Sequence, residues 1–82
     1  MDILNDFDFG VSKVNLDKIL KERNISKNKI SKDLRMERSI IVRYCSDSIQ
    51  RVDLAVMSKL CYYLDVGYDE LLTYIPPEDK QK

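Results

Sequence analysis

The stretch ISKNKISKDLRMERSIIVRYC, residues 25–45, carries the pattern that decides the fold. Its apolar side chains recur at three- and four-residue spacing, which is typical of helices that bury one face. The pattern predicts a helix over residues 27–34, a three-residue turn over 35–37 and a second helix over about 38–46. Basic side chains fill many of the gaps between the apolar positions. The inward positions of this pair are Ile30, Leu34, Ile41 and Tyr44.

Three further helices are predicted on either side of this pair. Asn15 is a suitable N-cap for a helix over residues 16–23, and Asp53 for one over residues 54–64. A short fifth helix is expected in YDELLTY, residues 68–74, with Leu71 and Leu72 toward the core. The apolar stripes of the two longer segments consist of Leu16, Ile19, Leu20, Leu54, Met57, Leu60, Cys61 and Leu64.

The 82 residues are enough for one small core and too few for two. We expect residues 1–14 to form an N-terminal arm or short strand, residues 15–75 the folded domain, and residues 76–82 a polar C-terminal tail. The segment TYIPP near the end of the chain could pair as a strand with VSKV or with a strand of a partner molecule. The core is expected to include Ile30, Leu34, Ile41, Met57 and Leu60.

The net charge of zero hides an uneven distribution along the chain. Residues 1–12 contain three acidic residues and no basic ones, and residues 52–82 contain six acidic and three basic residues. Residues 13–51, by contrast, contain eleven basic and five acidic residues. This asymmetry indicates one electropositive face on a protein that is neutral overall.

The composition argues against several classes of function. Histidine is absent and there are only two glycines, so the sequence offers neither the most frequent general base nor a Gly-rich phosphate loop. The two cysteines, Cys45 and Cys61, are too few for a disulfide framework or a common zinc site, and Cys61 fits core packing better than redox chemistry. No apolar run is long enough to span a membrane, and Asp2 and Asp6 stand where a signal peptide would be basic. We therefore expect a cytoplasmic, non-enzymatic protein without metal or cofactor.

Two segments together resemble the phage repressor and Cro-type family, also called XRE-like. The first is ISKNKISKDLRMERSIIVRY, a capped helix, short turn and second helix, and the other is RVDLAVMSKLCYYLDVGYDELLTYIP. The second is similar to the last two helices of a subgroup of small bacterial regulators. The likeness covers about residues 15–75 and implies an all-α, five-helix, lambda-repressor-like domain that binds double-stranded DNA.

The sequence departs from the family pattern at four positions. Arg35 takes the place of the usual turn glycine, which would cost about 1 kcal/mol in a left-handed conformation. Ser31 replaces a small alanine, and Lys27 replaces a glutamine. Glu37 stands where the family commonly has Ser or Thr as N-cap, and its carboxylate is expected to help cap the helix while repelling the DNA backbone.

The resemblance implies that the helix at residues 38–46 enters the major groove. Arginine can bond both major-groove acceptors of guanine, valine can touch a thymine methyl, and glutamate can accept from a cytosine amine. Lysine, arginine and hydroxyl groups suit phosphate oxygens. The expected base contacts are Glu37, Arg38, Ser39, Val42 and Arg43, and the expected phosphate contacts are Lys27, Asn28, Lys29, Ser46, Ser48 and Arg51.

Other interpretations remain open from sequence alone. Basic residues on a helix are often only a solvated face, and the fold could serve protein contact, as in an antitoxin-like or phage-encoded adaptor. RNA binding is disfavoured because Tyr44, the only aromatic residue in the basic stretch, is expected to point inward. A homodimer is expected, since one unit reads few base pairs. Tyr62, Tyr63 and Tyr68 either contribute to that dimer surface or cover the small core.

Overall fold

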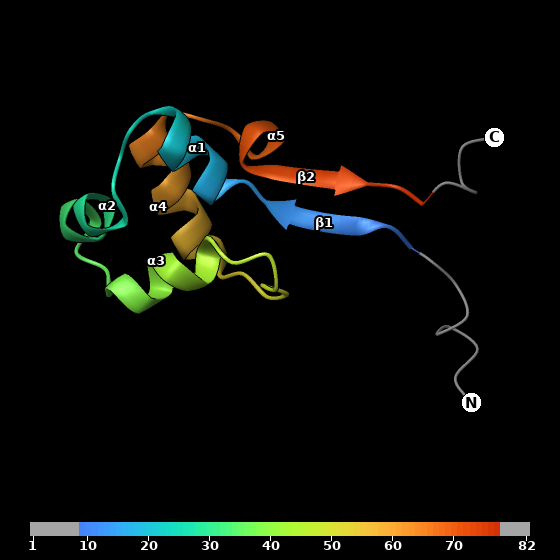
Figure 1. Ribbon diagram of the computed structural model, residues 1–82, viewed down its shortest axis with the longest axis horizontal. Coiled ribbons are helices and arrows are strands. Elements are labelled where there is room, and N and C mark those ends of the chain that lie inside the picture. Colours follow the sequence, from blue (N-terminus) through green and yellow to red (C-terminus); the bar gives the residue numbers. More distant parts are fainter. Residues whose placement is uncertain (1–8, 78–82) are drawn as a thin grey trace.

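In the computed structural model, which describes residues 9–77, the helices gather at one end and a two-stranded sheet extends from them (Figure 1). The fold prediction of five short helices with an accompanying pair of strands is confirmed. Helices α2 and α4 have the predicted bounds. In chain order the elements are β1 (Val11–Val14), α1 (Leu16–Glu22), α2 (Lys27–Leu34), α3 (Arg38–Tyr44), α4 (Leu54–Leu64), α5 (Tyr68–Leu71) and β2 (Leu72–Ile75).

The strands β1 and β2 pair in antiparallel fashion, with Val11 opposite Ile75 and Val14 opposite Leu72. Pairing of VSKV with the segment before the prolines is thus confirmed. The predicted fifth helix was too long, because its second half is β2. Leu71 is buried as the last residue of α5, whereas Leu72 is half-buried as the first residue of the strand. Pairing with β1 gives the backbone groups of this segment their hydrogen-bond partners.

Asn15 precedes α1 as predicted, but its side chain does not cap the helix. The side-chain amide donates instead to the carbonyl of Glu70 at 2.9 Å and to the hydroxyl of Thr73 at 2.7 Å. The backbone N–H of Asn15 donates to the carbonyl of Leu71 at 2.7 Å. Asn15 therefore joins the start of α1 to the junction of α5 and β2, a use that its local sequence could not reveal.

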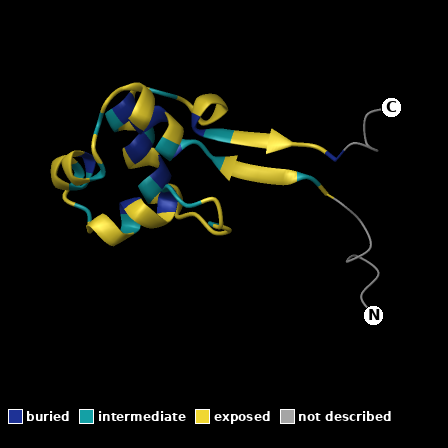
Figure 2. Cartoon of the chain, in the orientation of Figure 1, coloured by how far each residue is buried: buried dark blue, intermediate teal, exposed yellow. Residues whose placement is uncertain are grey.

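The core lies between the helices, where every helix contributes at least one buried side chain (Figure 2). Leu34 was predicted as core, but it is only half-buried and packs at the margin. Leu54 was predicted in the buried stripe of α4, but it is 67% exposed. The buried hydrophobic core consists of Leu16, Ile19, Leu20, Ile30, Ile41, Tyr44, Met57, Leu60, Leu64 and Leu71.

Three helices end in the same way, each with a non-glycine residue in the left-handed conformation. Asn24 has φ 58°, Arg35 has φ 55° and Asp65 has φ 56°. After Arg35, the N–H of Met36 returns to the carbonyl of Ser31 at 3.0 Å, and corresponding bonds follow the other two residues. This is the Schellman arrangement, which satisfies the last carbonyls of a helix. Arg35 thus adopts the left-handed conformation for which the sequence analysis expected a cost.

Helices α1 and α3 are shorter than predicted, by one and two residues respectively. Arg23 follows α1, and its guanidinium donates to the carbonyl of Leu64 at the end of α4. The chain leaves helical geometry after Cys45, where Ser46 begins the loop to α4. Residues 1–8 of the expected arm and residues 78–82 of the expected tail lie outside the described residues. Among residues 9–77, no helix is long and apolar enough to cross a bilayer.

Candidate nucleic-acid interface

Helix α3 presents two faces of opposite character. Ile41 and Tyr44 point into the core and are fully buried. The opposite face forms the α3 ridge, defined as Arg38, Ser39, Val42 and Arg43, and all four residues are exposed. In Figure 1, α3 lies at the edge of the helical end, with α2 beside its start and the loop to α4 at its end. The ridge is therefore open to a ligand approaching from that side.

Glu37 is the N-cap residue of α3 by position, as predicted, with φ −63° and ψ 141°. Its side chain, however, makes no capping hydrogen bond, so the expected capping role is wrong. The Ser26 hydroxyl before α2 behaves differently and accepts from the N–H of Lys29 at 3.0 Å. Glutamate carries one more methylene than the aspartate, asparagine and serine that favour this position. The exposed carboxylate of Glu37 thus stands beside the α3 ridge.

The guanidinium of Arg43 leans toward the loop that follows α3. Its Nη1 donates to the carbonyl of Arg51 at 3.5 Å, and its Cζ lies 5.1 Å from the centroid of the Tyr44 ring. Within the loop, the hydroxyls of Ser46 and Ser48 are 2.8 Å apart, and the N–H of Ser48 donates to the Ser46 oxygen at 3.1 Å. The loop hollow, of about 410 Å³, is lined by Arg43, Ser46, Ser48, Ile49, Gln50 and Arg51.

A second hollow of about 500 Å³ lies along the exposed side of α2 and includes the predicted Asn28 and Lys29. The Lys29 ammonium is 3.0 Å from the carboxylate of Asp33, one helical turn later. Asp33 also accepts a hydrogen bond from the hydroxyl of Tyr63 on α4. Lys29, a predicted phosphate contact, is therefore paired within the protein, and a phosphate would have to compete with Asp33 for its ammonium group.

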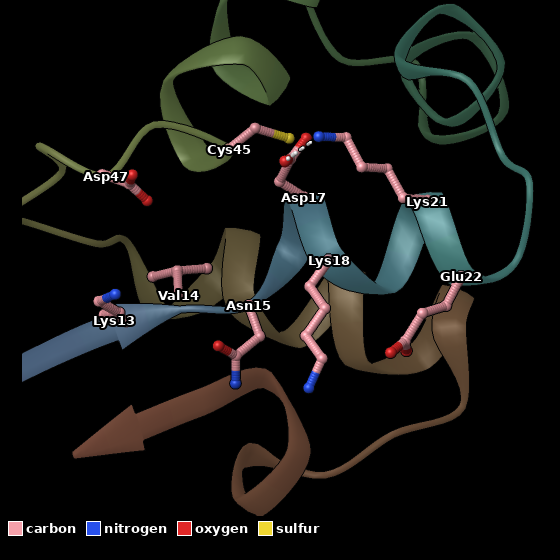
Figure 3. Close-up of a pocket in the computed structure, with 9 residues that line it drawn as sticks. All are labelled: Lys13, Val14, Asn15, Asp17, Lys18, Lys21, Glu22, Cys45 and Asp47. Carbon is pink, nitrogen blue, oxygen red and sulfur yellow. Dashed lines mark ion pairs between the residues drawn. The ribbon is translucent and has the colours of Figure 1, made fainter. Parts of the chain in front are cut away.

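Lys27 is likewise paired, although it faces a different element. Its ammonium is 3.7 Å from the carboxylate of Asp17 on α1, which is also 3.0 Å from the ammonium of Lys21. Figure 3 shows Asp17 and Lys21 beside Cys45 at a hollow of about 450 Å³. Lys27 does not line the α2 hollow. The structure thus separates Lys27 from the Asn28 and Lys29 with which it was predicted to act.

These pairings lower the pKa of the carboxyl groups of Asp17 and Asp33. Hydrogen bonds from the Tyr63 hydroxyl and then from Lys29 lower the pKa of Asp33 below its usual value. The hydrogen bond from Lys21 lowers the pKa of Asp17, with further help from the charge of Lys27. The bond to Asp33 raises the pKa of Lys29. Both acids are therefore anions at neutral pH.

The cysteines show no arrangement for metal or redox chemistry. Cys45 and Cys61 are both free thiols and half-buried, and burial raises the pKa of each thiol above its ordinary value. A raised pKa leaves less of the reactive thiolate at neutral pH. Within residues 9–77 no cluster of three or more Cys, Asp or Glu side chains is placed to hold a metal ion.

The predicted site residues leave out several groups that line or support this surface. Gln50 lines the loop hollow and Lys32 lines the α2 hollow, and each stands close in sequence to predicted phosphate contacts. Their polar side chains and their positions in the sequence could have identified both as candidate phosphate contacts. Tyr44 was expected only as a core residue, yet its hydroxyl accepts a hydrogen bond from the N–H of Asp53 at 2.7 Å. No sequence pattern indicates that bond, because it depends on the path of the loop.

Comparison with known proteins agrees with this geometry. The family model described as a Cro/C1-type HTH DNA-binding domain matches residues 15–77. The structure is similar to that of a Bacteroides fragilis protein provisionally classed as DNA-binding, with 19% identity, a TM-score of 0.65, and coverage of 77% of this chain and all of that one. It is also similar to the transcriptional regulator VanUg, with 19% identity, a TM-score of 0.64, and coverage of 87% of this chain and 93% of that one. At this identity the two likenesses concern the fold. No curated protein matches the sequence significantly.

Proposed function

Because the chain belongs to the Cro/C1-type helix-turn-helix DNA-binding domain family, we propose that it is a sequence-specific transcriptional regulator that lays α3 in the major groove. The observation that carries the proposal is the α3 ridge, whose four side chains are exposed on the face opposite the buried Ile41 and Tyr44. A helix fits the major groove of B-DNA with its exposed face toward the base edges. The protein would act as a repressor by occupying its site, and it would work in the cytoplasm.

Each proposed contact follows from side-chain chemistry. Arg38 and Arg43 would read guanine, Val42 a thymine methyl, Ser39 an adjacent base edge, and Glu37 a cytosine amine. Phosphates on the two sides of the groove would meet α2 and the loop hollow, which flank α3 along the chain. The proposed phosphate contacts are Lys27, Asn28, Lys29, Ser46, Ser48 and Arg51.

We propose that the functional unit is a homodimer. One α3 ridge reaches only a few base pairs, and two-fold pairing would place two ridges about 34 Å apart on one side of the duplex. Tyr62 is 88% exposed and therefore does not cover the core, which leaves its ring available for such contact. Sedimentation of the free protein and of its DNA complex measures the stoichiometry. One protein per site at saturation would exclude the dimer.

The experiment that tests the proposed function is selection of bound duplexes from a random DNA pool, followed by binding of the selected site and of random duplex at several salt concentrations. A groove-reading protein should enrich one sequence and lose affinity by orders of magnitude between low and moderate salt. Absence of enrichment together with salt-insensitive non-binding would contradict the proposal. That result would favour the protein-contact use of the fold.

A further inference from the structure

The loop between α3 and α4, residues 46–52, is tied to α3 at its far end. Asp53, the first residue beyond it, donates its N–H to the hydroxyl of Tyr44 at 2.7 Å. Two residues earlier, the carbonyl of Arg51 accepts from Arg43 at 3.5 Å. The loop thus leaves α3 after Cys45 and returns to the last two residues of the same helix. Both ends of the loop are fixed to α3.

The Tyr44 side chain is suited to this role because its ring cannot move freely. The residue is 0% exposed and belongs to the core cluster, so close packing fixes the position of its hydroxyl. On the other side of the bond, Asp53 caps α4 by accepting from the N–H of Ala55 at 2.8 Å. The Asp53 carbonyl also accepts from the N–H of Met57 at 2.9 Å. A single hydroxyl therefore connects α3, the end of the loop and the start of α4.

We propose that Tyr44 is a positioning residue for DNA binding, acting through the loop. This inference rests on the proposed function. The loop carries Ser46, Ser48 and Arg51, which line one hollow together with Arg43 of the α3 ridge. Tyr44 fixes the distance between these polar groups and the ridge, so that the phosphate contacts and the base contacts are in register when the protein meets DNA. A loop that is already ordered loses less conformational freedom on binding.

The substitution Tyr44→Phe removes the hydroxyl and leaves the ring in the core. The N–H of Asp53 then loses its acceptor, and the loop loses its link to Tyr44. A matched control is Tyr74→Phe, which also removes a tyrosine hydroxyl bonded to the backbone, in this case to the carbonyl of Phe9 at 2.7 Å. Tyr74 lies on β2, in the sheet that extends away from the helices (Figure 1). Thermal unfolding shows whether each variant is folded before its DNA binding is measured.

The test measures the affinity of each full-length variant for the duplex selected by the wild-type protein, over a range of salt. The slope of log affinity against log salt counts the phosphates that are contacted. Tyr44→Phe is expected to bind about tenfold more weakly, with a slope smaller by about one to two, because the loop contacts are lost. Tyr74→Phe should match the wild type in both quantities. A purely structural role would reduce the folded fraction without changing the slope.

A second variant keeps the test available if Tyr44→Phe does not fold. Two glycines inserted between Ile49 and Gln50 loosen the loop while Tyr44 and its core contacts remain, and the same loss of slope is expected. Wild-type slope and affinity in either folded variant would overturn the positioning role. A wild-type protein that binds no duplex would instead overturn the proposed function, so the two failures are distinguishable.

Discussion

Ser31 and Met36 are joined by two hydrogen bonds across the turn between α2 and α3. The N–H of Met36 donates to the carbonyl of Ser31 at 3.0 Å, and the Ser31 hydroxyl donates to the carbonyl of Met36. The second bond requires a hydroxyl, which an alanine at this position would lack. The pair fixes the turn on both sides of the left-handed Arg35. The angle between α2 and α3 therefore does not depend on a glycine.

Replacing Arg35 with glycine should stabilise the protein by about 1 kcal/mol. A side chain with a Cβ is strained at φ 55°, and glycine is not. Urea denaturation measures the change in the free energy of unfolding. Asn24→Gly is the matched control, because asparagine tolerates the same conformation and should gain only a few tenths of a kcal/mol. A destabilised Arg35→Gly would show that other contacts of the arginine outweigh the strain.

Removal of the Ser31 hydroxyl should destabilise the turn. We expect Ser31→Ala to reduce the free energy of unfolding by about 1 kcal/mol, the usual net value of one hydrogen bond in a protein. Ser58→Ala, at an exposed position of α4, controls for the higher helix propensity of alanine. Urea midpoints of the two variants give the comparison. Equal midpoints would mean that the backbone bond alone holds the turn.

Arg43→Ala should reduce sequence discrimination. We expect the selected site to lose about 1–3 kcal/mol of binding free energy, with a smaller loss for random duplex, because a bidentate contact to guanine disappears. Lys59→Ala, on the exposed side of α4, removes a charge outside the proposed interface and serves as control. Fluorescence anisotropy with both duplexes measures the ratio. An equal loss for the two duplexes would assign Arg43 to phosphate contact only.

Asp33→Asn should increase the affinity for DNA of any sequence. The carboxylate of Asp33 holds the ammonium of Lys29 at 3.0 Å and adds a negative charge to the α2 hollow. With the carboxylate neutralised, Lys29 can pair fully with a phosphate, and the salt slope should rise by about one. Asp69→Asn removes the same charge on α5, away from α3 in Figure 1, and should change the slope little. Weaker DNA binding by Asp33→Asn would mean that Asp33 orients the Lys29 ammonium toward the phosphate.

Acid should destabilise the protein through Asp17 and Asp33. Hydrogen bonds from Lys21 and from Tyr63 are the main causes that lower the pKa of Asp17 and Asp33, respectively, in the folded state. Their contribution is therefore complete above the unfolded pKa of about 4 and is lost as the pH falls through the lower folded values. Urea midpoints should stay level from pH 7 to about pH 5 and then decline. The double variant Asp17→Asn, Asp33→Asn should decline less steeply, and a parallel decline would exclude these two residues as the cause.

Local rules predicted much of this fold. Asp53 accepts from a backbone N–H of α4, as its position indicated, and α2 and α4 have the predicted bounds. The apolar spacing identified the buried faces of α2 and α3, because burial on a helix repeats with the helical period. Leu54 fits the same spacing but lies where no other element covers the helix. Periodicity identifies a face and does not show how far the core extends along it.

The contacts that the sequence did not reveal join residues far apart along the chain. Asn15 and Glu37 were both predicted as caps from their neighbours, and neither side chain caps its helix. Asn15 finds partners on α5 and β2 instead. At the proposed interface, the exposure of the α3 ridge follows from helix geometry, and so does the pair of Lys29 with Asp33 four residues later in the same helix. The pairing of Lys27 with Asp17 and the bond from Tyr63 to Asp33 follow instead from how α1, α2 and α4 pack. Short-range patterns cannot supply such pairings.

The β1–β2 pair also bears on the order in which the chain folds. Asn15 beside β1 bonds Thr73 of β2, 58 residues further along the chain, so every helix lies within the segment that this contact closes. Closing a loop costs about 0.6 kcal/mol more for each doubling of its length, and the cost falls once docked helices bring the ends together. The strands should thus pair late in folding, after the helices have associated. Slow hydrogen exchange in β1 and β2 would then report that the whole helical interior is intact.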